Sequence, residues 1–166
     1  MTATVQKRPV VYLETTFVSR LTGWLSRVEN SARKEQLATR ALWRRMEGRV
    51  EAVISEITWT EIGEGDPECA KQRKLAVAGL PMWMESRESR ALMKVLLECK
   101  AVNAAKPNDA GHIAVAAVGG ADVLLSWNFQ DIANDEMMPK IRALVERAGF
   151  RCPRIVAPDK LPEDWP

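Results

Sequence analysis

The stretch RPVVYLETTFVS, residues 8–19, gives the first indication of the fold. Its apolar run Val10–Leu13 is short and continuous, which is typical of a strand buried on both faces of a parallel sheet. Glu14 follows this run without a break, and two threonines come directly after it. In an open parallel sheet, functional groups gather beyond the carboxyl ends of the strands, so the position of Glu14 predicts a functional role.

The composition is that of an ordinary globular protein. The 166 residues are 46% hydrophobic and 28% charged, which suits one domain with one sizeable core. The N-terminal MTATVQKRP has no apolar segment of the signal-peptide type, and no apolar run is long enough to span a bilayer. Cys69, Cys99 and Cys152 are widely spaced, which fits a reducing compartment. We expect a single domain, residues 1–166, in the cytoplasm and away from membranes.

The charge is distributed unevenly, although the net charge is only +2. The first 50 residues contain ten Lys or Arg and four Asp or Glu, whereas the rest of the chain contains fourteen and eighteen. Many of the basic residues fall in the helical stretch 31–49, which includes Arg40, Arg44 and Arg45. A basic helix face can bind nucleic-acid phosphates or an acidic protein, but a solvated helix face has the same pattern.

Apolar runs of strand length alternate with stretches of helical periodicity. The expected strands are residues 10–13, 50–55, 80–85, 121–127 and part of 151–158. The expected helices are residues 31–49, 56–65, 66–79, 86–102, 106–120 and 135–149. Strands that alternate with helices form a parallel sheet covered on both faces. The predicted fold class is therefore α/β, with three α/β/α layers and a central parallel sheet of four to five strands.

Four polar side chains fall at or near the carboxyl ends of the predicted strands, where such a sheet binds its ligands. Glu14 ends the first strand, Asn128 follows the strand 121–127, and Asp109 opens an apolar helix. Glu61 follows Ile57 by four residues and so lies on the inward face of its helix. An inward carboxylate is costly unless it is paired or binds a metal ion.

The residue types favour a hard cation. The chain has one histidine, which excludes a zinc site built on several histidines. Carboxylate and amide oxygens are typical ligands of Mg²⁺ or Mn²⁺. Each acid also has a plainer use: Glu14 at an exposed strand end, Asp109 as a helix cap and Glu61 in an ion pair. Asn is equally common as a turn residue. The inference of a metal site therefore depends on the four residues taken together.

Two further residues have both a structural and a functional interpretation. His112 lies one turn beyond Asp109, and a lone histidine of this kind is most often a structural residue. Trp127 precedes Asn128 and can either stack on a base or belong to the core.

Three segments together resemble PIN-domain proteins of the VapC toxin type. They are VYLETTFVSRL (11–21), ISEITWTEIGEGDPE (54–68) and NDAGHIAVAAVGGADVLLSWNFQDIAN (108–134). In this resemblance the first three acids of the family fall on Glu14, Glu61 and Asp109, and the fourth position falls on Asn128. The family more often has Asp at the first position. Asn128 is uncharged, and Asp131, three residues further, is a second candidate for the fourth position.

The resemblance implies a PIN-like fold and a Mg²⁺-dependent ribonuclease. Glu14, Glu61 and Asp109 would hold Mg²⁺ or Mn²⁺ with Asn128, and one of the acids could act as a base. RNA would be the substrate, the chain would form a homodimer, and a cognate antitoxin would hold it inactive. The alternative is a PIN-like module that binds RNA or protein without catalysis, with impaired metal binding.

Three hydroxyl residues are candidates for orienting the acids. Thr15, Thr16 and Ser126 lie next to Glu14 or just before Asn128, where they can hydrogen-bond to carboxylates. Hydrogen bonding to the backbone at strand ends is the alternative use of these hydroxyls.

Overall fold

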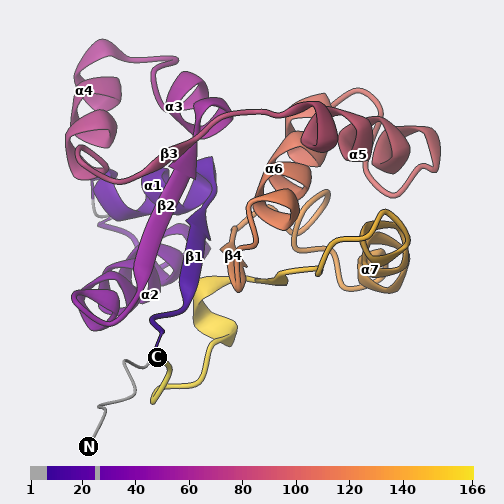
Figure 1. Ribbon diagram of the computed structural model, residues 1–166. Helices are drawn as coiled ribbons and strands as arrows, with labels where there is room; N and C mark the ends of the chain where they lie inside the picture. The colour runs from indigo at the N-terminus through magenta and orange to yellow at the C-terminus, as the bar shows by residue number, and fades with distance from the viewer. Residues whose placement is uncertain (1–6, 25–26) are drawn as a thin grey trace, which may run out of the picture.

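A five-stranded parallel sheet forms the centre of the computed structural model, which describes residues 7–24 and 27–166 (Figure 1). The strand order is β3-β2-β1-β4-β5. The strands are β1 (Val10–Leu13), β2 (Glu51–Ser55), β3 (Met82–Trp83), β4 (Val123–Leu125) and β5 (Arg154–Val156). The predicted α/β class and the parallel sheet are confirmed, at the upper limit of the expected strand number.

Helices cover both faces of this sheet. Among the described residues they are α1 (Thr15–Thr22), α2 (Ser31–Met46), α3 (Glu56–Glu61), α4 (Pro67–Ala76), α5 (Arg87–Glu98), α6 (Pro107–Val118), α7 (Met138–Arg147) and the short 3-10 helix η1 (Pro158–Lys160). Helices α1 and α2 pack on one face, and α5, α6 and α7 cover the other. No helix in the described part of the chain is long and apolar enough to cross a membrane.

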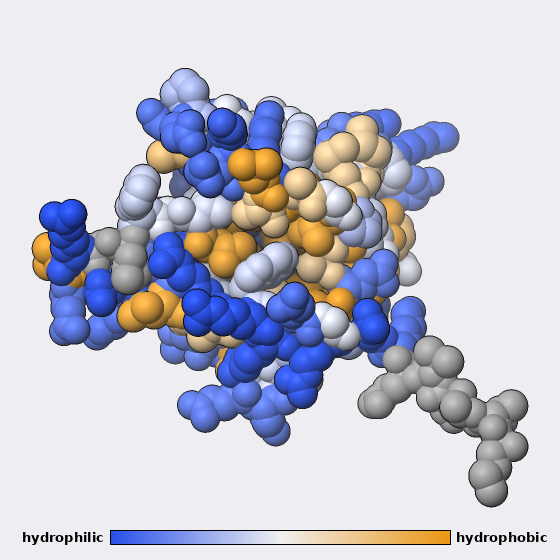
Figure 2. All heavy atoms as spheres, turned by 90° about the vertical axis from the view of Figure 1, so that its left-hand side faces the viewer, coloured by the Kyte–Doolittle hydropathy of each residue, from blue (hydrophilic) through white to orange (hydrophobic). Residues whose placement is uncertain are grey.

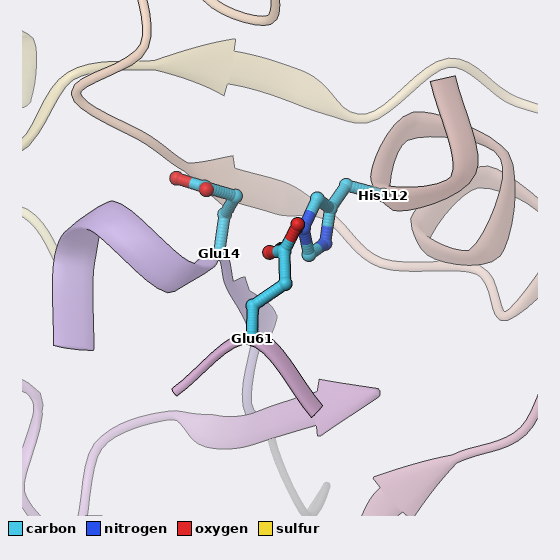
Figure 3. Close-up of side chains that lie close together, drawn as sticks. All are labelled: Glu14, Glu61 and His112. Carbon is cyan, nitrogen blue, oxygen red and sulfur yellow. Dashed lines mark hydrogen bonds and ion pairs between the residues drawn. The ribbon is translucent and has the colours of Figure 1, made fainter. Parts of the chain in front are cut away.

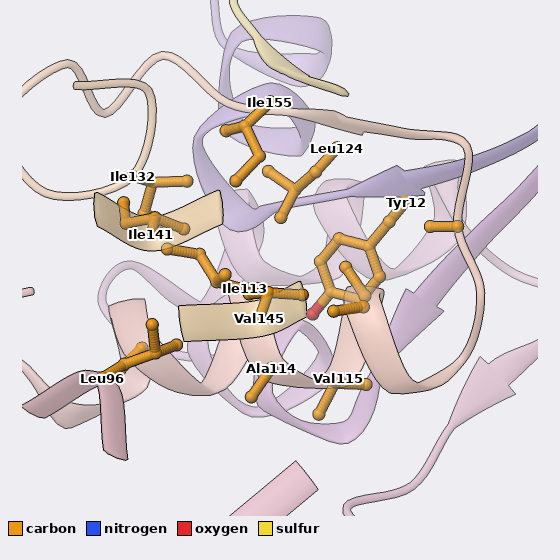
Figure 4. Packing of buried hydrophobic residues seen from close by; sticks show 14 of the residues in the cluster. Tyr12, Leu96, Ile113, Ala114, Val115, Leu124, Ile132, Ile141, Val145 and Ile155 are labelled. Carbon is orange, nitrogen blue, oxygen red and sulfur yellow. The ribbon is translucent and has the colours of Figure 1, made fainter. Parts of the chain in front are cut away.

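The alternation of side chains along β1 divides the core into two layers. Val10 and Tyr12 belong to the layer under α6 and α7, whereas Val11 and Leu13 belong to the layer under α1 and α2. Figure 4 shows the first layer, with the Tyr12 ring packed among aliphatic side chains. Because each face of β1 meets a core layer, the strand is apolar throughout, as expected for a central parallel strand.

One helix departs from the sequence prediction. The sequence pattern predicts no helix over residues 15–22, and the structure has α1 there. Glu14 is its N-cap, and the carboxylate accepts a hydrogen bond from the backbone N–H of Thr16 at 3.0 Å. Two β-branched threonines are weak helix formers, so the helix depends on this cap and on the burial of Phe17 and Val18.

The strand order places one reversal between β1 and β4. From β1 the chain proceeds outward to β2 and β3, and it then returns to place β4 on the other side of β1. The carboxyl ends of β1 and β4 therefore flank the switch point of the sheet, where open α/β sheets bind their ligands. Glu14 follows β1 and Ser126 follows β4 at this point.

Gly119 allows the end of α6 to approach β3. A Cβ atom built on Gly119 would lie 2.3 Å from Cζ3 of Trp83, whereas the φ angle of −69° is one that any residue adopts. We expect Gly119→Ala to lower the free energy of unfolding by about 1–3 kcal/mol through overpacking, as measured by urea denaturation. In a Trp83→Leu background the same substitution should cost much less. An equal cost in both backgrounds would show that the indole ring is not the cause.

Candidate metal centre

Glu14 is a buried carboxylate held by donors from two segments. Its side chain is at the carboxyl end of β1, and the residue is 3% exposed. Oε2 accepts hydrogen bonds from the backbone N–H and hydroxyl of Thr16 and from the Ser126 hydroxyl at 2.8 Å. Among the described residues none donates to Oε1, so this oxygen is the one left for a ligand.

The two consecutive threonines serve two different acids. The Thr16 hydroxyl donates to Glu14 and accepts the backbone N–H of Trp127 at 2.7 Å. The Thr15 hydroxyl donates to Oε2 of Glu61, which comes from another helix. Two adjacent residues in the first turn of α1 thus hold two carboxylates from different elements.

Glu61 is the last residue of α3 and lies close to Glu14. Besides Thr15, it accepts a hydrogen bond from Nε2 of His112 at 2.9 Å, and Oε1 accepts one from Asn108 at 3.0 Å. Burial alone would raise its pKa, but the hydrogen bond and charge of His112 and the other donors lower the pKa to about 2. Glu61 is therefore a carboxylate at neutral pH.

His112 is fully buried on α6 and lies behind Glu61. Its Nδ1 is 2.8 Å from the Tyr12 hydroxyl, which is 2.6 Å from Oγ of Ser55. Burial lowers the pKa of His112, but Tyr12 and the carboxylates of Glu61 and Glu14 outweigh it and raise the pKa above its ordinary value. The sequence pattern favours a structural role for this histidine, and its position one turn from Asp109 is the local signal of its contact with the site.

Figure 3 shows Glu61 from α3 lying against His112 from α6, with Glu14 from the end of β1 next to them. Each offers one ligand atom, and these atoms lie within 4.8 Å of one another. The structure thus brings together two of the predicted acids with a histidine that was not expected in this place.

Asp109 lies near this group but outside it. It is half-buried in the first turn of α6, and its Oδ2 is buried with no hydrogen-bond partner among the described residues. Burial, and then the charge of Asp131, raise the pKa of this carboxyl group. An unpaired buried carboxylate oxygen is costly, and a bound cation would remove that cost.

The two candidates for the fourth position both have other partners. The side-chain oxygen of Asn128 accepts the backbone N–H of Asp131 at 3.1 Å, which is a turn contact. Asp131 is buried and forms an ion pair with Lys106 at 2.7 Å. Both residues also act on Asp109: the charge of Asp131 raises the pKa of that carboxyl group, and a hydrogen bond with Asn128 lowers it.

The basic residues predicted to bind nucleic acid make contacts within the chain. Arg40 donates to the backbone oxygens of Leu21 and Gly23, and Arg45 donates to the backbone oxygen of Glu163. Arg44 is exposed. Since α2 leads into the start of β2, its last turn lies at the amino end of the sheet, opposite the carboxylates.

Trp127 belongs to the core and not to an exposed stacking surface. The residue is 8% exposed, and its indole N–H donates to the hydroxyl of Thr39 at 2.8 Å. The neighbouring Phe129 is exposed and packs edge to face against it.

Comparison with known proteins supports the fold. No family model and no curated protein match this chain. A similar solved structure is that of VapBC2 from Rickettsia felis bound to a DNA fragment from their promoter. The match has a TM-score of 0.57 and 14% identity, and it covers 89% of this chain and 98% of that one. The chain has a PIN-like fold. The predicted three-layer architecture and its likeness to VapC-type proteins are thus confirmed at the level of the fold.

The residues at the switch point of this PIN-like fold fit a hard divalent cation. The donor set is rich in carboxylate oxygens, which Mg²⁺ and Mn²⁺ prefer. Oδ2 of Asp109 and Oε1 of Glu14 accept no hydrogen bond from the described residues, so they are the two oxygens that such an ion would satisfy.

Removal of the Thr16 hydroxyl tests whether this group stabilises the structure around Glu14. We expect Thr16→Val to lower the free energy of unfolding by about 1–3 kcal/mol, because the backbone N–H of Trp127 loses its acceptor. Urea denaturation without metal measures the effect. Thr22→Val is the control, since Thr22 on the same helix donates only to the carbonyl of Val18. Equal losses in the two variants would contradict the role given to Thr16.

Proposed function

We propose that the chain is a divalent-metal-dependent ribonuclease of the VapC type. The observation that carries the proposal is the buried, unpaired Oδ2 of Asp109 near the close group of Glu14, Glu61 and His112, at the switch point of a PIN-like sheet. Helix capping does not account for this arrangement, because the cap of α1 uses one oxygen of Glu14 only, whereas a cation would also satisfy the oxygen of Asp109.

Glu14, Asp109 and Glu61 are the proposed ligands of Mg²⁺ or Mn²⁺. Such an ion lowers the pKa of a bound water and neutralises charge on a phosphodiester. The chain's own contribution is orientation: Ser126 and Thr16 hold Glu14 by one oxygen, and Thr15 holds Glu61. A carboxylate fixed by one oxygen presents the other in a constant direction, which reduces the reorganisation needed for catalysis.

The site has three acids rather than four. Asn128 is uncharged and Asp131 is paired with Lys106, so the fourth position adds less negative charge than an unpaired acid would. This arrangement lessens repulsion between carboxylates in the metal-free protein and weakens attraction for a second ion. We therefore propose one firmly bound metal, held chiefly by Glu14 and Asp109.

The second candidate is a PIN-like module that binds RNA or protein without catalysis. The Lys106–Asp131 ion pair favours it, because a lysine beside the fourth position opposes a cation there. Binding of RNA without cleavage would support this candidate.

The proposed partners are RNA, a second copy of the chain and a cognate antitoxin, in the cytoplasm. A cavity of about 620 Å³ between α1, α2 and α4 suits a partner segment, since Trp24 at its edge is 90% exposed and Arg40 and Arg73 line it. Figure 2 shows this face, where apolar side chains lie among strongly hydrophilic ones. An exposed tryptophan between arginines is typical of surfaces that a protein partner covers. Arg44 remains a candidate contact for RNA phosphates.

The ligand roles predict loss of activity without loss of fold. Glu14→Gln, Glu61→Gln and Asp109→Asn should each reduce cleavage of a labelled single-stranded RNA by about 100-fold or more in the presence of Mg²⁺. Excess EDTA should abolish cleavage by the wild-type protein. Glu146→Gln, an exposed acid on α7, is the control and should leave the rate unchanged. Full activity in EDTA would reject the proposed reaction.

The Asp109 carboxylate should also lower the free energy of unfolding of the metal-free protein. We expect Asp109→Asn to raise the free energy of unfolding without metal by about 1 kcal/mol, because it removes a half-buried charge beside Asp131. Addition of MnCl₂ should stabilise the wild-type protein more than the variant, as a ligand that binds the native state must. Urea denaturation with and without MnCl₂ gives both comparisons. A variant that is less stable than wild type without metal would show that Asp109 is a structural residue.

A further inference from the structure

A buried polar chain connects the centre of the sheet with the proposed metal site. It runs from Ser55 at the end of β2, through the hydroxyl of Tyr12 in β1 and the imidazole of His112 in α6, to Oε2 of Glu61. The three contacts measure 2.6, 2.8 and 2.9 Å. Ser55, Tyr12 and His112 are fully buried, so solvent does not replace the two contacts among these three residues.

The chain of contacts closes on itself through α3. Ser55 is the N-cap of α3 and accepts the backbone N–H of Thr58, and Glu61 is the last residue of the same helix. Both ends of α3 are therefore bound to one Tyr12–His112 pair. A short helix held at both ends has little freedom to rotate, so this pair contributes to the direction of the Glu61 side chain, together with Thr15 and Asn108.

The direction of the last hydrogen bond follows from the chemistry of its partners. Glu61 is ionised and can only accept, so Nε2 of His112 carries a proton and donates it. Nδ1 of His112 and the Tyr12 hydroxyl share the second contact, and the Tyr12 hydroxyl and Oγ of Ser55 share the first. Every member of the chain thus has a hydrogen-bond partner.

We infer that His112, oriented by Tyr12, is a positioning residue that fixes the Glu61 carboxylate in the metal site. The inference rests on the proposed function, since it concerns the same site. His112 acts through Glu61 and does not need to contact metal or RNA.

The position of Glu61 explains why such a residue is needed. Glu61 ends a six-residue helix, and its side chain is 21% exposed, so a flexible glutamate there could turn toward solvent. His112 approaches from the buried side because Gly111 lets α6 lie close to α3: a Cβ atom on Gly111 would be 2.6 Å from Cδ1 of Ile57. The helix contact and the hydrogen bond thus occur at adjacent residues.

The test is Mn²⁺ binding to the purified full chain, measured by calorimetry without RNA. His112→Leu keeps an apolar side chain in the core but removes the donor, and we expect its affinity for Mn²⁺ to fall by about 10-fold to 100-fold. His112→Gln keeps an N–H at the position of Nε2 and should bind within about threefold of wild type. Tyr12→Phe keeps the ring and should give a smaller loss than His112→Leu. If His112→Leu does not fold, the Mn²⁺ affinity of Tyr12→Phe tests the inference in its place.

Ile113→Val is the matched control. Ile113 is the next residue of α6 and is fully buried, but its side chain has no polar contact. The substitution should lower stability by about 0.5–1.5 kcal/mol without changing Mn²⁺ affinity. RNA cleavage by the same variants should follow the order of their Mn²⁺ affinities.

The outcomes separate this inference from the proposed function. Wild-type affinity in His112→Leu, with lowered stability alone, would show a structural histidine and overturn the inference while the metal site stands. Equal loss in His112→Gln would overturn it in favour of direct ligation by the imidazole. Unchanged affinity in Tyr12→Phe would overturn the role of Tyr12. Absence of Mn²⁺ binding by the wild-type protein would overturn the proposed function itself, and the inference with it.

Discussion

The burial of one carboxylate governs the structure around the switch point. Glu14 is 3% exposed at the edge of the core, where an ionised group is stable only if donors replace its lost hydration. The donors come from the first turn of α1 and from Ser126 after β4. Because Glu14 is also the N-cap of α1, the same charge starts the helix that supplies the donors. The helix, the carboxylate and the β4 loop therefore stabilise one another.

The site combines satisfied and unsatisfied charge. Glu61 accepts hydrogen bonds from three side chains, and burial within this network holds its orientation. Asp109, by contrast, keeps a buried oxygen without a partner in the described structure. A fully satisfied pocket would be more stable but would offer nothing to a ligand, whereas a strained one offers free energy that binding can recover.

The fold followed from local patterns to a large extent, and the site only in part. The apolar runs and their alternation with helices predicted the parallel sheet, because burial on both faces leaves that pattern in the residues. Helix α1 escaped prediction because its first residues, Thr15 and Thr16, have low helix propensity and its cap was assigned to chemistry alone. The places of Glu14 at a strand end and of Asp109 at a helix start suggested those two acids, and the helical spacing from Ile57 suggested Glu61. The contact between His112 and Tyr12 joins residues 100 positions apart, and no local pattern encodes it. The same limit applies to Arg40 and Arg45, since a count of charges does not reveal the backbone carbonyls that they bind.

The register of the sheet explains why the polar groups meet on one side. Tyr12 pairs with Val53 and with Leu124, and these three residues form one row in the core layer under α6. Two positions further along each strand, the side chains point to the same face again. Those positions are Glu14, Ser55 and Ser126. A polar row thus follows directly after an apolar row across three neighbouring strands, on the face where α6 carries Asp109 and His112. The proposed metal site is therefore a consequence of strand periodicity: the pattern that buries Tyr12 also directs Glu14 toward the helix that completes the site.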